Sequence, residues 1–271
     1  MGKFSGFLLA SDFDGTLADS QGRIPEPVRD KLRYYIAEGG MFTVCTGRTK
    51  QGFHLYSPDI INAPVLVANG IMAYDFAAEK TVFCDGIGRE DAGIVTALQR
   101  AFPGLCIELY SADFRSFAIC PNDRTRRHFA FQFIEWTEIS TVEEAAVPIV
   151  KIMLSCGAAH GGEIQRWLDL SIGAYRLKYI PSTGDYVEII RSNTGKGIGL
   201  RKLASALGAL PDRVFAVGDG ENDLEMLSAA SRCFVPENGC AAAKAAASHI
   251  VRSNDEGAVK HAIEMIEALY C

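Results

Sequence analysis

The sequence predicts an α/β fold in which a parallel-sheet core, with helices on both faces, is interrupted by an inserted α+β domain. In the first and last thirds of the 271-residue chain, short apolar runs alternate with helical patterns, which is typical of parallel sheets. In the middle third, helices interleave with paired strands, which indicates a unit with its own sheet. We therefore expect a discontinuous core, residues 1–82 and 187–271, around an inserted domain at residues 83–186.

The first third supplies strands and a helix in quick succession. Phe7 to Ala10 is a continuous apolar run closed by an acid, as expected of a buried parallel strand. Apolar residues at helical spacing from Val28 to Ile36 predict a helix, and Gly39-Gly40 ends it. The other elements expected here are strands at Met41–Cys45 and Pro64–Ala68 and a helical stretch that begins at Arg48.

The middle and last thirds continue the pattern with elements of both kinds. In the middle third we expect helices around Ile94–Ala101 and Ile164–Leu168 and strands at Cys106–Tyr110, Phe117–Cys120, Ile149–Leu154 and Tyr175–Ile180. In the last third we expect strands at Val214–Val217 and Cys233–Val235 and helices at Lys196–Leu207, Leu224–Leu227, Ala241–Ala247 and through Val259 to Ile266. The last third thus completes the sheet that the first third begins.

Composition narrows the classes of protein and partner. The net charge of −6 argues against a nucleic-acid partner, because phosphate backbones attract basic surfaces. No apolar run approaches the length of a membrane span, and Phe7–Ala10 is too short for a signal-peptide core. The eight cysteines form no C-x-x-C pair and have no histidines at zinc spacing, so we expect reduced thiols. We therefore expect a cytoplasmic protein with no nucleic-acid and no membrane partner.

The strongest chemical signal is the run Asp12-Phe13-Asp14-Gly15-Thr16-Leu17, directly after the first predicted strand. Ligands of open parallel sheets bind beyond the carboxyl ends of the strands, where this motif falls. Two carboxylates separated by one residue suit a nucleophile, Asp12, and a proton donor, Asp14. The alternative is an acidic turn that merely closes a strand, and the second Asp together with Thr-Leu argues against it.

Two further motifs offer groups for a phosphoryl oxygen. Thr46-Gly47 follows a predicted strand, so a hydroxyl and free backbone N–H groups are available to an anion. Simple N-capping by Thr46 is the plainer alternative. Lys196 begins a predicted helix and can neutralise a transferring phosphoryl group, although a solvated lysine is the alternative. The run around it is not a P-loop, because Gly197 stands where Ser or Thr is required.

A fourth motif, Gly218–Asp223, comes directly after a predicted strand and supplies the oxygen ligands that Mg²⁺ prefers. An EF-hand is excluded, because its twelfth position is Ala230. The acids of the first and fourth motifs would repel one another if they converged without a counterion. These acids are Asp12, Asp14, Asp219 and Asp223. A divalent cation together with Lys196 would remove that repulsion and leave an electropositive site for phosphate.

With these four motifs in order, the chain resembles the haloacid dehalogenase superfamily, and specifically its Cof-type phosphatases with a large inserted cap. The resemblance covers nearly the whole chain, including Asn69-Gly70 and Asn254–Gly257. It implies a Rossmann-like core, a C2B-like cap domain and a Mg²⁺-dependent reaction. Aspartate at position 14, where the superfamily's ion pumps have Thr and its phosphonatases have Ala, implies phosphate-ester hydrolysis or phosphomutase chemistry. Val235–Gly239 keeps the Asn, Asn238, but lacks the family's usual Asn-Ala pair, which we expect to affect loop packing more than catalysis.

The resemblance also assigns roles to single residues. It implies that Asp12 is the nucleophile, and that Asp14 is the general acid/base and offers its carbonyl to the metal. The phosphate-binding residues that it implies are Thr46, Gly47, Lys196 and Asn222. The metal-binding residues that it implies are Asp12, Asp14, Asp219 and Asp223.

In this family the inserted domain closes over the site as a lid and contacts the leaving group of the substrate. The candidate substrate contacts are Arg48, beside the second motif, and Lys151, a lone charge inside an apolar strand. Lys151 can equally serve to protect a sheet edge.

Three functions remain open at this point. The first is a phosphatase that hydrolyses a small phosphorylated metabolite, such as a sugar phosphate, through an aspartyl-phosphate on Asp12. The second is a phosphosugar mutase that uses the same intermediate. The third is a non-catalytic regulatory protein on this fold, which would not need Asp14 or Asp219.

Overall fold

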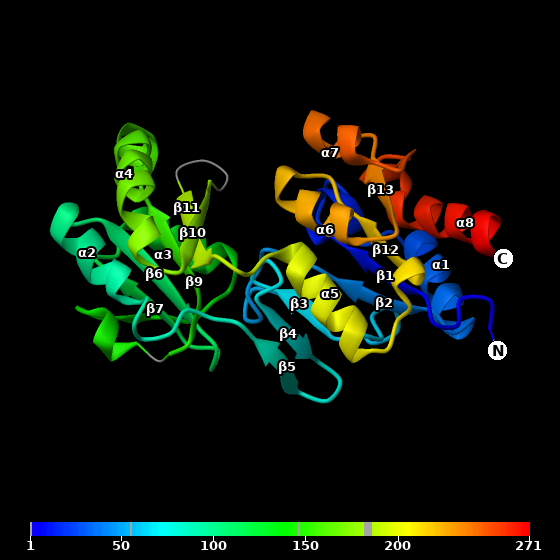
Figure 1. The fold of residues 1–271 in the computed structure, drawn as a ribbon, viewed down its shortest axis with the longest axis horizontal. Coiled ribbons are helices and arrows are strands. Elements are labelled where there is room, and N and C mark those ends of the chain that lie inside the picture. The colour runs from blue at the N-terminus through cyan, green and yellow to red at the C-terminus, as the bar shows by residue number, and fades with distance from the viewer. Residues whose placement is uncertain (1, 55, 146, 182–185) are drawn as a thin grey trace. The chain divides into compact units, whose positions relative to one another are not determined.

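The computed structural model describes residues 2–54, 56–145, 147–181 and 186–271 (Figure 1). The chain forms two compact units. Unit 1 comprises Met1–Gly47, Leu55–Phe83 and Gly195–Cys271, and unit 2 comprises Arg48–His54 and Cys84–Thr194. Within the described ranges, none of the helices has the length and apolar character that crossing a membrane requires.

The centre of unit 1 is a five-stranded parallel sheet in the order β14-β13-β12-β1-β2. Its strands are β1 (Leu8–Ser11), β2 (Met41–Val44), β12 (Val214–Val217), β13 (Arg232–Pro236) and β14 (His249–Val251). β1 is paired on both sides, and all four of its residues are buried, as its continuous apolar run predicts. Because β12 is its neighbour, two segments far apart in the sequence meet at the end of β1.

Helices cover both faces of this sheet (Figure 1). On one face lie α5 (Lys196–Ala206), α6 (Leu224–Ala229) and α7 (Ala241–Ala246), where Leu200 and Met226 share an apolar core with Leu8 of β1. On the other face lie α1 (Glu26–Ala37) and α8 (Ala258–Tyr270). The predicted parallel-sheet core with helices on both faces is therefore confirmed.

A second, three-stranded sheet in the order β3-β4-β5 belongs largely to unit 1. It consists of β3 (Val65–Val67), β4 (Met72–Asp75) and β5 (Lys80–Cys84), and β3 and β4 run antiparallel. A parallel bridge between Cys45 and Leu66 links β3 to the chain just beyond β2. The strand expected at Pro64–Ala68 is thus present, but it leads into a hairpin that the sequence did not predict.

The prediction of a helical stretch from Arg48 is wrong. Residues 48–54 form turns without a helix, and they belong to unit 2. The Gln51 amide donates to Ser116 Oγ at 3.4 Å, and His54 Nε2 lies 2.8 Å from the Gln132 carbonyl oxygen. Gly52 disfavours a helix, and the two contacts stabilise turns in its place.

Unit 2 is built on a six-stranded sheet in the order β10-β11-β9-β6-β7-β8, antiparallel except for the parallel pair β7–β8. Its strands are β6 (Cys106–Ser111), β7 (Ser116–Ile119), β8 (Thr137–Glu138), β9 (Ile149–Ser155), β10 (Leu177–Pro181) and β11 (Tyr186–Arg191). One face shares an apolar core with α2 (Gly93–Ala101) and α4 (Gly157–Ser171). The third helix, α3 (Asp123–Phe131), connects β7 to β8.

The inserted unit ends later in the sequence than predicted. β11 pairs with both β9 and β10, and Val187 and Ile189 of β11 contribute to the apolar core of unit 2. The return to the core predicted at residue 187 is therefore too early, because the chain re-enters unit 1 at Gly195. The apolar alternation of β11 is equally compatible with a strand of either unit, so sequence pattern alone does not assign it.

Candidate active site

The candidate site lies at the carboxyl ends of two adjacent strands of unit 1. β1 and β12 are paired so that Ser11 is opposite Val217, and the backbone N–H of Asp12 donates to the Val217 carbonyl at 2.9 Å. Parallel pairing therefore makes Asp12 and the Gly218-Asp219 turn leave the sheet at the same edge, where ligands of such sheets bind.

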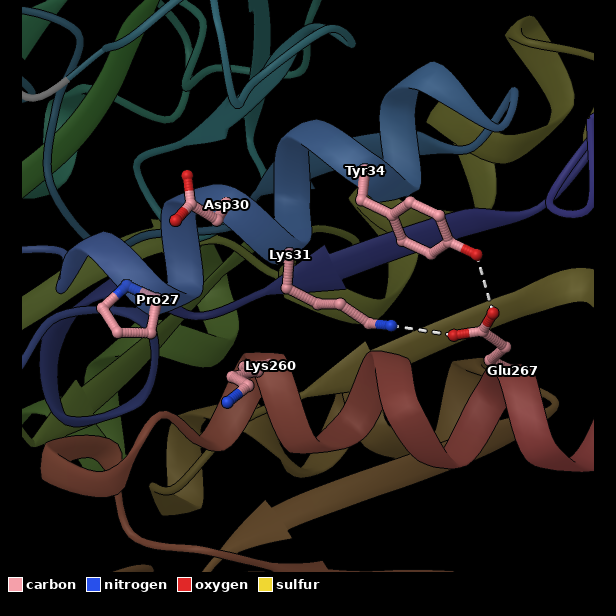
Figure 2. A pocket seen from close by; sticks show the side chains of 6 residues that line it. All are labelled: Pro27, Asp30, Lys31, Tyr34, Lys260 and Glu267. Atoms are coloured by element: carbon pink, nitrogen blue, oxygen red, sulfur yellow. Dashed lines mark hydrogen bonds and ion pairs between the residues drawn. The ribbon is translucent and has the colours of Figure 1, made fainter.

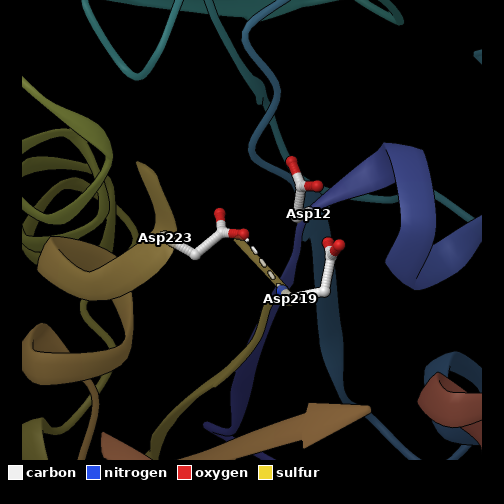
Figure 3. A group of neighbouring side chains, drawn as sticks. All are labelled: Asp12, Asp219 and Asp223. Carbon is white, nitrogen blue, oxygen red and sulfur yellow. Dashed lines mark hydrogen bonds between the residues drawn. The ribbon is translucent and has the colours of Figure 1, made fainter. Parts of the chain in front are cut away.

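Three carboxylates converge at this edge. Asp12, Asp219 and Asp223 each offer an oxygen, and these oxygens all lie within 4.8 Å of one another (Figure 3). Lys196, at the first residue of α5, reaches into the cluster, where its Nζ lies 2.5 Å from Asp12 Oδ1 and 2.7 Å from Asp223 Oδ1. Lys196 is 1% exposed, so its alternative interpretation as a solvated lysine is wrong.

Burial shapes the charge of these groups. It raises the pKa of Asp12 to about 8, an effect that Lys196 opposes and the Asp223 and Asp219 carboxylates reinforce. Burial likewise raises the pKa of Asp219, against the hydrogen bond from Thr16. For Lys196, burial alone would lower the pKa, but the carboxylates of Asp12 and Asp223 outweigh it and raise the pKa above its ordinary value. The lysine therefore stays charged, and Asp12 and Asp219 resist ionisation.

The loop after β1 contains a tight turn in which Gly15 has a positive φ that only glycine adopts readily. Asp14 has φ −76° and ψ 123°, and Gly15 has φ 77° and ψ 0°, which are the central angles of a type II turn. A Cβ on Gly15 would lie 2.7 Å from Asp219 Oδ2. The Thr16 hydroxyl then donates to Asp219 Oδ1 at 2.7 Å. The turn thus both requires glycine and places a donor that orients Asp219.

The second acidic loop is held by the side chain of Asp223. Its Oδ2 accepts the backbone N–H groups of Asp219 at 3.1 Å and of Gly220 at 3.0 Å, while its Oδ1 accepts from Lys196. Asp223 is fully buried, so these donors satisfy a carboxylate that would otherwise be costly to bury. Asp223 therefore fixes both the turn that carries Asp219 and the position of the Lys196 amine.

The other residues named from the sequence lie in different surroundings. The side chains of Asp14 and Asn222 are exposed, whereas Thr46 is buried just beyond β2, and its backbone N–H donates to the Leu66 carbonyl at 2.8 Å. A Cβ on Gly47 would lie 3.1 Å from Asn69 Oδ1. Arg48 and Lys151 belong to unit 2.

Sequence reasoning missed the residues that support the loop after β1. Asn238 donates from its amide to the Gly15 carbonyl at 2.8 Å, and its Oδ1 accepts the backbone N–H of Asn254 at 2.9 Å. Asn254 in turn donates to the Ala18 carbonyl at 2.9 Å. Two signals were available: Asn238 is retained in a stretch that otherwise departs from the family pattern, and Asn254 begins a stretch that the resemblance includes.

The cluster fits a divalent cation. One lysine balances one of three carboxylates, so two negative charges remain unbalanced when all the groups are ionised. Carboxylate oxygens are the ligands that hard divalent cations prefer. Asp219 Oδ1 accepts the hydrogen bond from Thr16, which orients the carboxylate, and a carboxylate has further lone pairs for a cation. The donor set therefore matches a cation of charge two in both charge and chemistry.

The parallel sheet thus gathers three acids and a lysine beyond its strand ends, and an α+β unit is inserted in the same chain. Residues 9–263 match the family described as haloacid dehalogenase-like hydrolase. This match covers most of the chain, and the chain belongs to this family. It is an enzyme of the phosphatase class, a hydrolase that acts on phosphate esters.

Two relatives match nearly the whole of this chain, and the first of them is named a phosphatase. The chain is 24% identical over 288 residues to 5-amino-6-(5-phospho-D-ribitylamino)uracil phosphatase YwtE of Bacillus subtilis, covering 95% of this chain and 97% of that protein. It is 29% identical over 280 residues to the chloroplastic endoribonuclease YBEY of Arabidopsis thaliana, covering 96% of this chain but 46% of that protein. The chain thus spans less than half of the plant protein.

Solved structures share the fold. A haloacid dehalogenase-like hydrolase from Bacteroides thetaiotaomicron superposes with a TM-score of 0.85 at 21% identity, covering 96% of this chain and 99% of that chain. At this level of identity the likeness concerns the fold alone. It extends over both units of the chain, so the combination of a parallel-sheet core with an inserted unit is common to the two proteins.

Proposed function

We propose that this hydrolase is a Mg²⁺-dependent phosphatase that cleaves a small phosphorylated metabolite through an aspartyl-phosphate on Asp12. The observation that carries the proposal is the convergence of Asp12, Asp219 and Asp223 within 4.8 Å, with Lys196 bonded to two of them. A nucleophilic carboxylate needs neutralised surroundings before an anionic phosphate can approach it, and this set of charges supplies them once a cation is bound.

In the proposed reaction, a carboxylate oxygen of Asp12 attacks phosphorus, and Asp14 gives a proton to the departing alcohol oxygen. Asp14 then accepts a proton from the water that attacks the aspartyl-phosphate, which releases phosphate and restores Asp12. The exposed side chain of Asp14 supports this role, because it can exchange protons with substrate and solvent.

Mg²⁺ would be held by Asp12, Asp219 and Asp223 and by the backbone carbonyl of Asp14, and when bound it neutralises charge beside the nucleophile. The phosphoryl oxygens would be bound by Thr46, Gly47, Lys196 and Asn222. The location of Thr46 just after β2 supports this assignment, since β2 is the direct neighbour of β1.

For the leaving group we propose a polar, hydroxyl-rich molecule that contacts Arg48 and Lys151 of unit 2. Lys151 is 4% exposed, its Nζ lies 3.5 Å from Glu188 Oε1, and it lies over the ring of Tyr110 at 5.4 Å. Glu108 is also buried in this sheet. These groups are buried and bonded within unit 2, so the support for a polyol comes from a relative. The relative YwtE is named for a phosphorylated ribityl compound, which is of this kind.

The decisive experiment is turnover of p-nitrophenyl phosphate with and without Mg²⁺. We expect Mg²⁺-dependent release of phosphate that Asp12→Asn abolishes and that Glu264→Gln, on the exposed face of α8, leaves intact. An active Asp12→Asn enzyme would exclude the covalent mechanism. A folded wild-type protein with no turnover on any phosphorylated metabolite would favour the non-catalytic alternative.

A second assay measures free phosphate and isomerised sugar phosphate with a panel of phosphorylated sugars, and it separates the phosphatase from the mutase. A phosphatase releases inorganic phosphate in proportion to the substrate consumed. Isomerised phosphosugar without free phosphate would identify a mutase.

We further propose a cytoplasmic location, which the reduced state of all eight cysteines supports.

A further inference from the structure

Two cysteines of unit 2 lie at one end of the β6–β7 ladder. These strands are antiparallel with Ile107 opposite Ile119, and Cys106 and Cys120 are the next residue on each strand beyond this last pair. Directly opposite residues of an antiparallel pair have Cα atoms about 4.5–5.5 Å apart. A disulfide spans Cα separations of about 4.4–6.8 Å. The last ladder pair, Ile107 and Ile119, therefore has a backbone spacing that suits a disulfide, and the two cysteines directly adjoin this pair.

The two thiols differ in exposure, which decides the order in which an oxidant meets them. Cys120 is exposed at the end of β7, where its φ of 50° turns the chain out of the ladder. Cys106 is 1% exposed, and its Sγ lies 2.6 Å from Thr125 Oγ1. Burial raises the pKa of the Cys106 thiol to about 11, an effect that Thr125 opposes and to which the neighbouring Cys120 contributes. An oxidant from solvent thus meets Cys120 first, with Cys106 behind it.

We propose that Cys106 and Cys120 form a reversible disulfide when the protein meets a hydroperoxide. The Cys120 sulfur attacks the peroxide, an S–O bond forms as the O–O bond breaks, and one water leaves. The Cys106 sulfur then attacks the Cys120 sulfur, the S–S bond forms as the S–O bond breaks, and the Cys106 proton leaves with the oxygen as a second water. The two thiols lose two electrons, which the peroxide accepts, and a dithiol reductant reverses the change.

The disulfide acts on the beginning of α3. Thr125 belongs to the N-terminal cap of this helix, in which the Asn122 side chain accepts the backbone N–H groups of Arg124 and Thr125. Oxidation removes the Cys106 thiol from its contact with Thr125. We therefore expect faster amide exchange in the first turn of α3 after oxidation. This inference is independent of the proposed phosphatase activity.

The test is peptide mapping of the intact protein after brief treatment with hydrogen peroxide and alkylation of the remaining thiols. Trypsin separates Ala101–Arg115, which contains Cys106, from Ser116–Arg124, which contains Cys120. We expect these two peptides to be joined, with the loss of two hydrogens, and to separate again after treatment with dithiothreitol.

Cys120→Ser is the informative variant, because an exposed position should accept serine without loss of the fold. It should abolish the joined peptide, whereas Cys271→Ser, at the other exposed cysteine, should leave it unchanged. Oxidation of Cys120 to a sulfinic acid with Cys106 still alkylatable would overturn the proposal. A joined peptide that persists in folded Cys120→Ser would also overturn it.

Discussion

Gly15 is the residue on which the geometry of the acid cluster most directly depends. Its φ of 77° and the 2.7 Å between its hypothetical Cβ and Asp219 Oδ2 predict two separate penalties for Gly15→Ala. The left-handed backbone costs about 1–2 kcal/mol of stability. Displacement of Asp219 lowers kcat/KM by about a hundredfold, since small misplacements of catalytic groups have effects of that size. Urea unfolding and steady-state kinetics measure the two losses separately.

Gly22 provides the matched control. It has a similar φ of 74°, and a Cβ there would have no neighbour within 4 Å. Gly22→Ala should therefore lose stability to a similar extent and keep its activity. Equal losses of activity in both variants would mean that backbone strain, rather than contact with Asp219, explains the effect.

The raised pKa of Asp12 predicts how Mg²⁺ affinity changes with pH. Because Asp12 in the metal-free protein holds its proton up to a pH of about 8, a cation that binds the carboxylate must displace that proton. The apparent affinity for Mg²⁺ should rise by up to about tenfold per pH unit below the pKa and level off above it. Calorimetric titrations in two buffers of different ionisation enthalpy measure both the affinity and the proton released. Proton release that is absent at pH 6.5 would contradict this prediction.

At the same scale, the sequence predicted the acids and the lysine better than the residues that support them. Asp12 and Asp219 each follow an apolar strand, and parallel pairing brings such positions together without further information. Asn238 and Asn254 act through backbone groups of a loop near residue 15, and this pairing exists only after folding. The spacing of residues in the sequence does not predict such a contact.

Among the elements of unit 1, α1 and α8 are linked by Glu267. Its carboxylate accepts from Lys31 at 2.8 Å and from the Tyr34 hydroxyl at 2.7 Å, beside the pocket that these helices line (Figure 2). Hydrogen bonds from Lys3, Lys31 and Tyr34 hold the pKa of Glu267 at about 2.

Because this pKa is lowered in the folded state, the stabilisation is present above the unfolded value of about 4.5 and is lost as pH falls toward about 2. Glu267→Gln should lower the free energy of unfolding at neutral pH by no more than about 1 kcal/mol, since the group is partly exposed to solvent. It should also weaken the pH dependence in that window. Glu264→Gln, whose carboxylate lies 3.8 Å from Lys260, should change both quantities less. Urea unfolding at pH 3 and pH 7 gives the comparison.

Elements that carry their own apolar pattern were predicted well, and those decided by contacts elsewhere were not. The helices from Lys196 and Leu224 and the strand between them lie where expected. The segment 48–54 adopts turns because its partners, Ser116 and Gln132, lie far along the chain. β11 was assigned to the wrong unit, since its alternating pattern does not name the strand with which it pairs.

For the whole molecule, the separate apolar cores of the two units predict that a cation stabilises one unit more than the other. The acid cluster lies in unit 1, and unit 2 has a separate core around β6 and β9. Addition of Mg²⁺ should slow amide exchange in β1 and β12 and leave β6 and β9 nearly unchanged. Hydrogen exchange followed by mass spectrometry measures this. Equal slowing in both units would show that they unfold together.

The division of the chain between the units has a further consequence for how such a protein can diversify. The acids and the lysine of the cluster all come from residues before 48 or after 194. Residues 48–194 contribute none of these four side chains. Substitutions, insertions and deletions in residues 84–194 can therefore accumulate over generations while the ancestral carboxylates and amine pass on unaltered. Proteins that share one reactive centre can in this way come to bind different ligands.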